Sequence, residues 1–116
     1  MAEATHVDSS VQGGVLVATI KSPTVSQYEA DVIGRQLQAE APGGAWRIVL
    51  DLSRVELLAS AGLGMLVTLQ RTAGEHNGRL IVTGAAPETL NILKMTRLDR
   101  LIPVAKDVEA GLKKLR

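Results

Sequence analysis

Residues 46–67 read WRIVLDLSRVELLASAGLGMLV, and this stretch decides the fold. Its first seven residues form an apolar run with the length and composition of a buried strand, typical of the centre of a sheet covered by helices. A helix is predicted from residue 61 to about residue 75. Ser60 lies at the change between the two, where serine is a favoured N-cap, so we expect its oxygen to accept from N–H groups of the first helical turn.

The alternation of strands and helices continues on both sides of this stretch. Further strands are predicted at residues 15–20, paired with a shorter strand near 5–8, at 80–83, and at 101–104 as an edge strand closed by Pro103. Further helices are predicted from the Ser26 cap to about residue 40, from Pro87 to about 95, and over 108–115 after the Asp107 cap. The order predicts an α/β fold, a mixed sheet of about five strands with four helices, in one domain spanning residues 1–116.

The composition limits the possible partners. The 116 residues suffice for one hydrophobic core, which must be aliphatic because the chain has one Trp, one Tyr and no Phe. So few rings argue against a base-stacking nucleic-acid surface. With 13 basic and 12 acidic residues, the net charge of +1 offers no strong field for nucleic acid or an anionic membrane. The absence of cysteine excludes disulfides and thiolate metal sites.

The first ten residues carry acidic side chains and lack the basic and apolar regions of a secretory signal. The longest weakly polar run, residues 57–67, is shorter than the roughly 20 residues that cross a bilayer as a helix. We therefore expect a cytoplasmic protein without membrane insertion.

The predicted helix after Ser60 is apolar over about 200° of its circumference, wider than the roughly 100° that covering a sheet requires. Its main stripe contains Gly62, Met65, Leu66, Leu69 and Ala73, and Leu63, Val67 and Gly74 lie beside it. Two interpretations stay open: a helix wedged between the sheet and a neighbouring helix, or a partner-binding edge. Gly62 and Gly64 favour the partner slightly, because glycine weakens a helix but lets another backbone approach closely.

The sequence gives little support to a catalytic function. Ser60 lacks the glycine two places earlier that a nucleophile elbow requires, and only His6 and His76 could act as a base. Two distant histidines without cysteine do not predict a metal site. The pair Gly62 and Gly64 begins like a dinucleotide fingerprint but lacks its third glycine. We expect no enzyme activity, no cofactor and no small-molecule substrate.

Asp51 ends the predicted central strand, and two roles are considered for it. It could orient a phosphate-handling partner, but an acid at a strand end more often satisfies the turn that follows. We favour the structural role.

The segments IVLDLSRVE at residues 48–56 and ASAGLG at 59–64 are followed by GRLIV at 78–82, PE at 87–88 and MTRLDRL at 95–101. Together, these segments resemble the STAS domain of bacterial anti-sigma factor antagonists. The last of these is similar to a family segment of the form T-x-L-D-x-L. The resemblance covers about residues 13–115, and the motifs occur in the family's order.

The resemblance implies partner switching. An unphosphorylated antagonist binds an anti-sigma factor that is also a serine kinase, which frees a sigma factor, and phosphorylation of a serine ends the binding. Ser60 matches that serine, and a phosphatase is a further candidate partner. The partner surface expected with it consists of Thr24, Ala59, Ser60, Ala61, Gly62, Leu63, Gly64 and Val67, with Asp51 in support.

The sequence departs from the family at two places. The usual Asp-Ser-Ser-Gly is replaced by Ala59-Ser60-Ala61-Gly62, and the usual Gly-x-Leu-Asp is replaced by Ser22-Pro23-Thr24-Val25. Our first hypothesis is an anti-sigma factor antagonist regulated at Ser60. The alternative is a constitutive STAS adaptor, in a transporter-associated or signalling complex, that needs no phosphorylation. A third hypothesis, a small hydrolase using Ser60, lacks a base and an acid.

Overall fold

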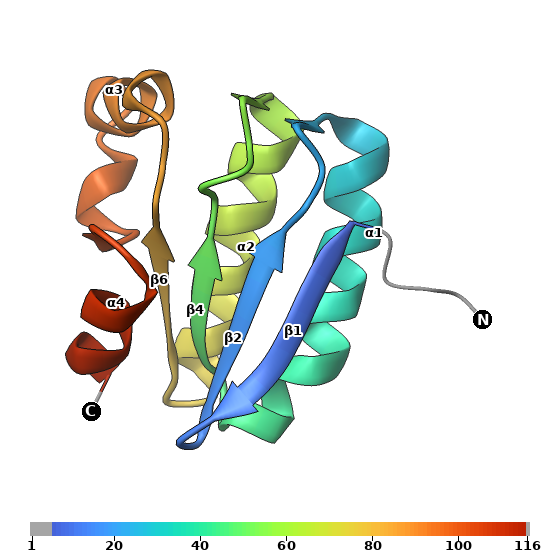
Figure 1. Ribbon diagram of the computed structural model, residues 1–116, viewed down its shortest axis with the longest axis vertical. Coiled ribbons are helices and arrows are strands. Elements are labelled where there is room, and N and C mark those ends of the chain that lie inside the picture. The colour runs from blue at the N-terminus through green and yellow to red at the C-terminus, as the bar shows by residue number, and fades with distance from the viewer. Residues whose placement is uncertain (1–5, 116) are drawn as a thin grey trace.

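The computed structural model describes residues 6–115, which form a five-stranded mixed sheet with helices on both faces (Figure 1). The strands are β1 (Val7–Gln12), β2 (Val15–Ile20), β4 (Arg47–Asp51), β6 (Arg79–Thr83) and β7 (Val104–Ala105), in the spatial order β1-β2-β4-β6-β7. β1 runs antiparallel to β2, and the other neighbouring pairs are parallel. The predicted fold class, an α/β fold with about five strands and four helices, is confirmed.

Helices α1 (Gln27–Glu40) and α2 (Ser60–Glu75) lie side by side on one face of the sheet, and α4 (Val108–Leu115) covers the other (Figure 1). Alternation along β2 explains the two layers, because successive side chains of a strand point to opposite faces. Leu16 and Ile20 pack into the core beneath α1 and α2, whereas Val15 and Val17 pack with the α4 side. Helix α3 (Pro87–Met95) lies near the β6 edge of the molecule (Figure 1).

The predicted limits of three helices agree well with the structure because local sequence signals define them. α1 begins directly after the Ser26 cap, and the Glu29 carboxylate accepts hydrogen bonds from the Ser26 backbone N–H and hydroxyl, at 3.0 and 2.6 Å. Pro87 is the first residue of α3. The Asp107 carboxylate caps α4 by accepting from the Ala110 N–H at 2.9 Å.

Three strand predictions require correction. β1 is longer and later than predicted, because all six of its residues pair with β2 through the Gly13-Gly14 turn; residue 5 of the predicted strand lies outside the described residues. The predicted edge strand at 101–104 is wrong in position, since only Val104 and Ala105 pair with β6. The central strand is slightly shorter than the predicted 46–52. The two-residue strands β3 (Thr24–Val25) and β5 (Leu57–Leu58), which form a separate parallel sheet, were not predicted.

Gln70 completes the hydrogen bonding of β6 where β7 is too short to reach. β7 pairs only with Val82 and Thr83, so the backbone of Leu80 has no strand partner on that side. The buried Gln70 side chain instead donates to the Leu80 carbonyl at 3.0 Å and accepts from the Leu80 N–H at 2.8 Å. It also donates to the carbonyl of Leu101 at 2.9 Å. This polar residue on α2 therefore replaces part of a strand.

Candidate functional site

Ser60 is the first residue of α2 and not its N-cap, which corrects the sequence prediction. The cap is Ala59, whose extended backbone (φ −76°, ψ 175°) still supplies the first helical carbonyl: the Leu63 N–H donates to it at 3.1 Å. The hydroxyl of Ser60 is exposed and makes no hydrogen bond to another group within residues 6–115. A free hydroxyl is therefore presented to solvent at the positive end of a 16-residue helix.

The small sheet of β3 and β5 explains why α2 begins where it does. Val25 pairs with Leu58 in this sheet, and the Val25 carbonyl accepts from the Ala59 N–H at 3.0 Å. The Pro23 carbonyl accepts from the N–H groups of Glu56 and Leu57, at 2.7 and 3.0 Å. These bonds hold the chain extended up to Ala59, so that the helix can begin only at Ser60.

The same sheet brings Thr24 close to the start of α2. Thr24 pairs with Leu57, and both side chains are exposed, Leu57 by 58%. Leu57 could not be assigned a role from the sequence, because a two-residue strand has too little pattern to show which residue faces outward. The edge formed by Thr24, Leu57 and Ser60 is called the α2 edge below.

The predicted partner-binding residues on α2 differ in exposure. Gly64 is exposed, and Ala61, Leu63 and Val67 are half-buried against the core. The packing interpretation therefore accounts for the half-buried side chains of this face, and the partner interpretation stays a prediction. Gly62 is buried.

The side chains nearest to Gly62 belong to its own chain. A methyl group at Gly62 would lie 2.5 Å from Leu58 Cδ1 and 3.2 Å from Val25 Cγ1. The small size of Gly62 lets α2 pack under the sheet of β3 and β5, so it supports the α2 edge from below and does not admit a partner's backbone.

The surroundings of Asp51 agree with the structural role favoured from its place at the end of the strand. Its two carboxylate oxygens accept from the hydroxyls of Thr83, at 3.1 Å, and Ser53, at 2.7 Å. Gly84, with φ +66°, follows β6 directly, and a methyl group there would lie 2.6 Å from Asp51 Oδ1. Asp51 therefore joins the ends of β4 and β6 and organises the loops that follow them.

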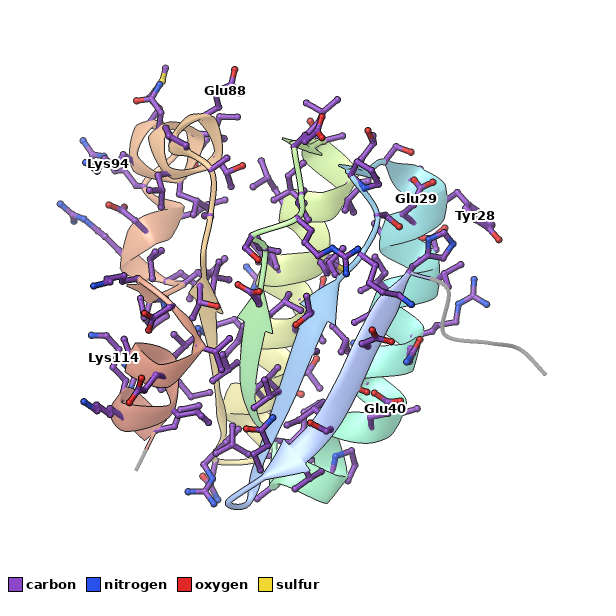
Figure 2. All side chains as sticks on the ribbon, viewed as in Figure 1. Tyr28, Glu29, Glu40, Glu88, Lys94 and Lys114 are labelled. Carbon is purple, nitrogen blue, oxygen red and sulfur yellow. The ribbon has the colours of Figure 1, made fainter. Side chains whose placement is uncertain are left out.

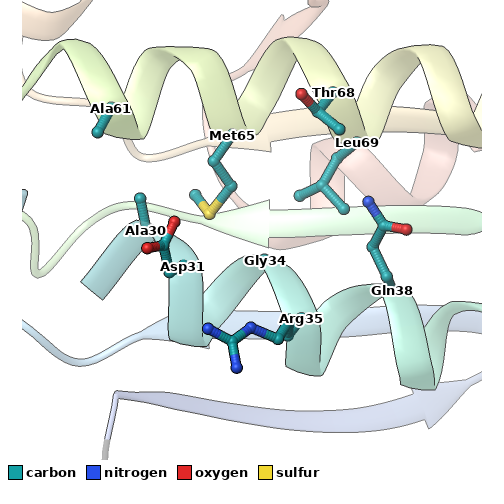
Figure 3. A pocket seen from close by; sticks show the side chains of 9 residues that line it. All are labelled: Ala30, Asp31, Gly34, Arg35, Gln38, Ala61, Met65, Thr68 and Leu69. Atoms are coloured by element: carbon teal, nitrogen blue, oxygen red, sulfur yellow. The ribbon is translucent and has the colours of Figure 1, made fainter. Parts of the chain in front are cut away.

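A groove of about 460 Å³ lies between α1 and α2 (Figure 3). Met65 and Leu69 contribute its apolar floor, and Asp31 and Arg35 stand on its α1 side (Figure 3). Ala61 lines the end of the groove that adjoins Ser60. At the start of α1, the hydrogen bonds from Ser26 lower the pKa of Glu29, so this carboxylate stays charged into mildly acidic conditions.

The histidines do not gather at this site. His6 Nδ1 lies 2.7 Å from the Ser22 hydroxyl, whereas His76 is at the opposite end of α2, where its ring stacks on Trp46. Among residues 6–115 no cluster of histidine and carboxylate side chains could hold a metal ion. The part of the chain that the structure describes also contains no helix long and apolar enough to span a bilayer.

Comparison with known proteins identifies the family that this fold and site define. Residues 23–103 match a family described as "Mlab, STAS domain", and the chain belongs to this STAS domain family. The chain is similar to BtrV of Bordetella bronchiseptica, named as a candidate anti-sigma factor antagonist: 27% of 98 residues are identical, covering 84% of each chain.

Solved structures show the same fold. A candidate anti-sigma factor antagonist from Thermotoga maritima superposes with a TM-score of 0.85 at 18% identity, covering 97% of this chain and 96% of the other. An anti-sigma factor antagonist from Mycobacterium paratuberculosis superposes with a TM-score of 0.80 at 24% identity, covering 100% and 99%. The resemblance to the STAS domain of anti-sigma factor antagonists is confirmed.

Proposed function

We propose that the chain is an anti-sigma factor antagonist that docks through the α2 edge on an anti-sigma factor with serine kinase activity. Phosphorylation of Ser60 ends the docking. The observation that carries the proposal is the exposed Ser60 hydroxyl at the first position of α2, next to the exposed Leu57. The similarity to BtrV supports the same role. The role requires no catalysis by this chain.

The position of Ser60 explains how one phosphate could change binding without unfolding the chain. A phosphoserine adds about −1.5 to −2 charges and three acceptor oxygens. The first N–H groups of α2 have no partner within the helix and can donate to it, and the helix dipole stabilises negative charge there. Leu57, three residues before Ser60, exposes its apolar side chain on β5, so a partner surface that buries both residues would also have to bury the phosphate.

The modification itself is tested first. The purified chain is incubated with the candidate kinase and ATP, and the phosphate is located by mass spectrometry. We expect phosphate on Ser60 and none after Ser60→Ala. Phosphate elsewhere, or none in the wild type, would refute the switch.

Binding is tested by calorimetry with the same kinase. Ser60→Ala is expected to bind like the wild type, whereas Ser60→Asp should bind at least tenfold more weakly, about 1.4 kcal/mol. Ser10→Asp is the matched control, because Ser10 is an exposed serine on β1. Equal affinities of the two Ser60 variants would contradict the mechanism.

The contribution of the α2 edge is tested with a pair of apolar residues. Leu57→Ser removes an apolar side chain that is 58% exposed, and Val11→Ser removes one that is 52% exposed on β1. We expect only Leu57→Ser to weaken the complex. A complex weakened equally by both would show that the α2 edge is not the docking surface.

The second candidate function is a constitutive STAS adaptor, and Ala59 favours it. Ala59 caps α2 where the resemblance leads us to expect an aspartate, so the segment around Ser60 offers a kinase no adjacent carboxylate. In that case Ser60 stays unmodified in the kinase assay. A pull-down from native extract would then recover an ABC ATPase or a scaffold component in place of an anti-sigma kinase.

A further inference from the structure

Exposed apolar side chains concentrate in one short segment of the fold. Of the six large apolar side chains that are exposed in the described chain, three lie between residues 92 and 101. Ile92 is 36% exposed, Met95 76% and Leu101 41%. Ile92 and Met95 are one turn apart on α3 and share a face of the helix. The other three are distributed over β1, α1 and β5, so this cluster is distinct from the α2 edge.

The same segment carries three exposed cations. Lys94 lies in the last turn of α3, and Arg97 and Arg100 flank or lie in the short 3₁₀ turn η2 (Leu98–Arg100). None of the three forms an ion pair among residues 6–115, although Asp99 lies in the same turn. The α3–η2 patch is defined by Ile92, Lys94, Met95, Arg97, Arg100 and Leu101.

Arg97 is held in a backbone conformation that favours glycine. Its φ of 62° and ψ of 17° are left-handed, a region that residues with a Cβ atom resist. A glycine would relieve this strain, but the chain places a long exposed cation here. Arg97 directly follows Thr96, the C-cap of α3, a position where left-handed backbone is common, and its side chain is exposed.

Charge is distributed unevenly despite the small net value. Residues 87–115 contain six basic and four acidic side chains, whereas residues 6–86 contain six basic and seven acidic ones. Figure 2 shows Lys94, Lys114 and Glu88 on one side of the molecule, and Tyr28, Glu29 and Glu40 lying toward the other. Residues 87–115 thus carry an excess of two positive charges, and an anionic surface would attract this part of the chain first.

We infer that the α3–η2 patch is a peripheral docking site for an anionic lipid surface. Ile92, Met95 and Leu101 enter the headgroup layer, while the three cations contact lipid phosphates. Charge complementarity favours an anionic lipid surface, because the three cations have no ion-pair partner among residues 6–115 and lie in the same segment as three exposed apolar side chains.

The test is co-sedimentation of the full chain with two kinds of vesicle. One contains equal parts of phosphatidylglycerol and phosphatidylcholine, and the other contains phosphatidylcholine alone. We expect the protein to sediment with the anionic vesicles at low salt, to be released by added salt, and to stay in solution with phosphatidylcholine. Failure to sediment with the anionic vesicles at low salt overturns the inference.

Two variants assign the binding to the patch without endangering the fold. Arg97→Gly removes a cation and relieves the left-handed strain, so it should bind on the order of fivefold more weakly while melting no lower than the wild type. Met95→Gln makes a 76% exposed side chain polar and should also weaken binding. Arg35→Ala is the control, since it removes an exposed cation from α1.

The outcomes separate the possible occupants of the patch. Weaker vesicle binding by both patch variants, with Arg35→Ala unchanged, supports the inference. An equal loss with Arg35→Ala shows only general charge attraction and overturns the assignment to the patch. Unchanged vesicle binding together with a weaker complex with the anti-sigma kinase shows that the patch contacts protein, and the lipid inference is then wrong.

Discussion

Two glycines in the first two turns of α2 allow a sharp test of how this helix is packed. Gly62 and Gly64 are two residues apart, so they point to different sides of the helix. A methyl group at Gly64 would have no atom within 4 Å, whereas one at Gly62 would lie 2.5 Å from Leu58 Cδ1 and 3.0 Å from Leu58 Cγ. The change Gly→Ala is therefore the same chemically at both positions and opposite in its expected effect.

The magnitudes follow from two competing terms. Replacing glycine by alanine within a helix stabilises it by about 1 kcal/mol, and at Gly64 nothing opposes this gain. At Gly62 the gain is smaller because the residue lies in the first turn, and forcing Leu58 aside costs about 1–3 kcal/mol. We expect Gly64→Ala to raise the free energy of unfolding by about 1 kcal/mol. Gly62→Ala should lower it by about 1 kcal/mol or more.

Urea unfolding followed by circular dichroism measures both changes, with equal slopes as the check that unfolding stays two-state. Thermal melting should agree, with a shift of a few degrees for each kcal/mol. Gly74→Ala is the control, because Gly74 is exposed in α2 and a methyl group there also meets open space. If Gly62→Ala is as stable as Gly64→Ala, α2 does not pack tightly under β5 and the reasoning fails.

Three further predictions concern stability. Gln70→Leu leaves the buried N–H and carbonyl of Leu80 and the part-buried carbonyl of Leu101 without partners, and should cost about 3 kcal/mol in urea unfolding. A loss below about 1 kcal/mol would mean that water replaces the amide. Because the pKa of Glu29 is lowered, its stabilising contribution is present at neutral pH and is lost as the pH falls through that lowered value. Glu29→Gln should therefore make the melting temperature depend less on pH in the acidic range. A melting temperature that falls with acid as steeply as in the wild type would contradict this. Ala45 has a left-handed backbone (φ 57°), so Ala45→Gly should raise the free energy of unfolding in urea by about 1 kcal/mol. A lower free energy of unfolding would show that the strain is absent.

The helices could be predicted from sequence because their ends are determined locally. Ser26, Pro87 and Asp107 each occupy the cap or first-turn position that their chemistry favours, and each helix begins as predicted. The prediction of a mixed sheet with crossover helices followed from the same alternation of elements.

Features determined by tertiary contacts could not be predicted. The cap of α2 moved from Ser60 to Ala59 because the pairing of β3 with β5, two segments more than 30 residues apart, keeps Ala59 extended. The role of Gln70 depends on how far β7 extends along β6, which no local pattern contains. For the site, Ser60 was singled out by its place between the central strand and the next helix, and the family resemblance gave Ser60 and Thr24 their predicted roles. Leu57 required the structure, because its exposure depends on that same pairing.

The stack of Trp46 on His76 has a practical consequence for spectroscopy. The rings lie 4.3 Å apart at the carboxyl end of α2, and the helix of 16 residues places them about 24 Å from Ser60. Trp46 is the only tryptophan in the chain, so its fluorescence should respond to unfolding. A partner that docks at Ser60 would leave this emission unchanged, and a fluorescent label for docking therefore has to be introduced near the start of α2.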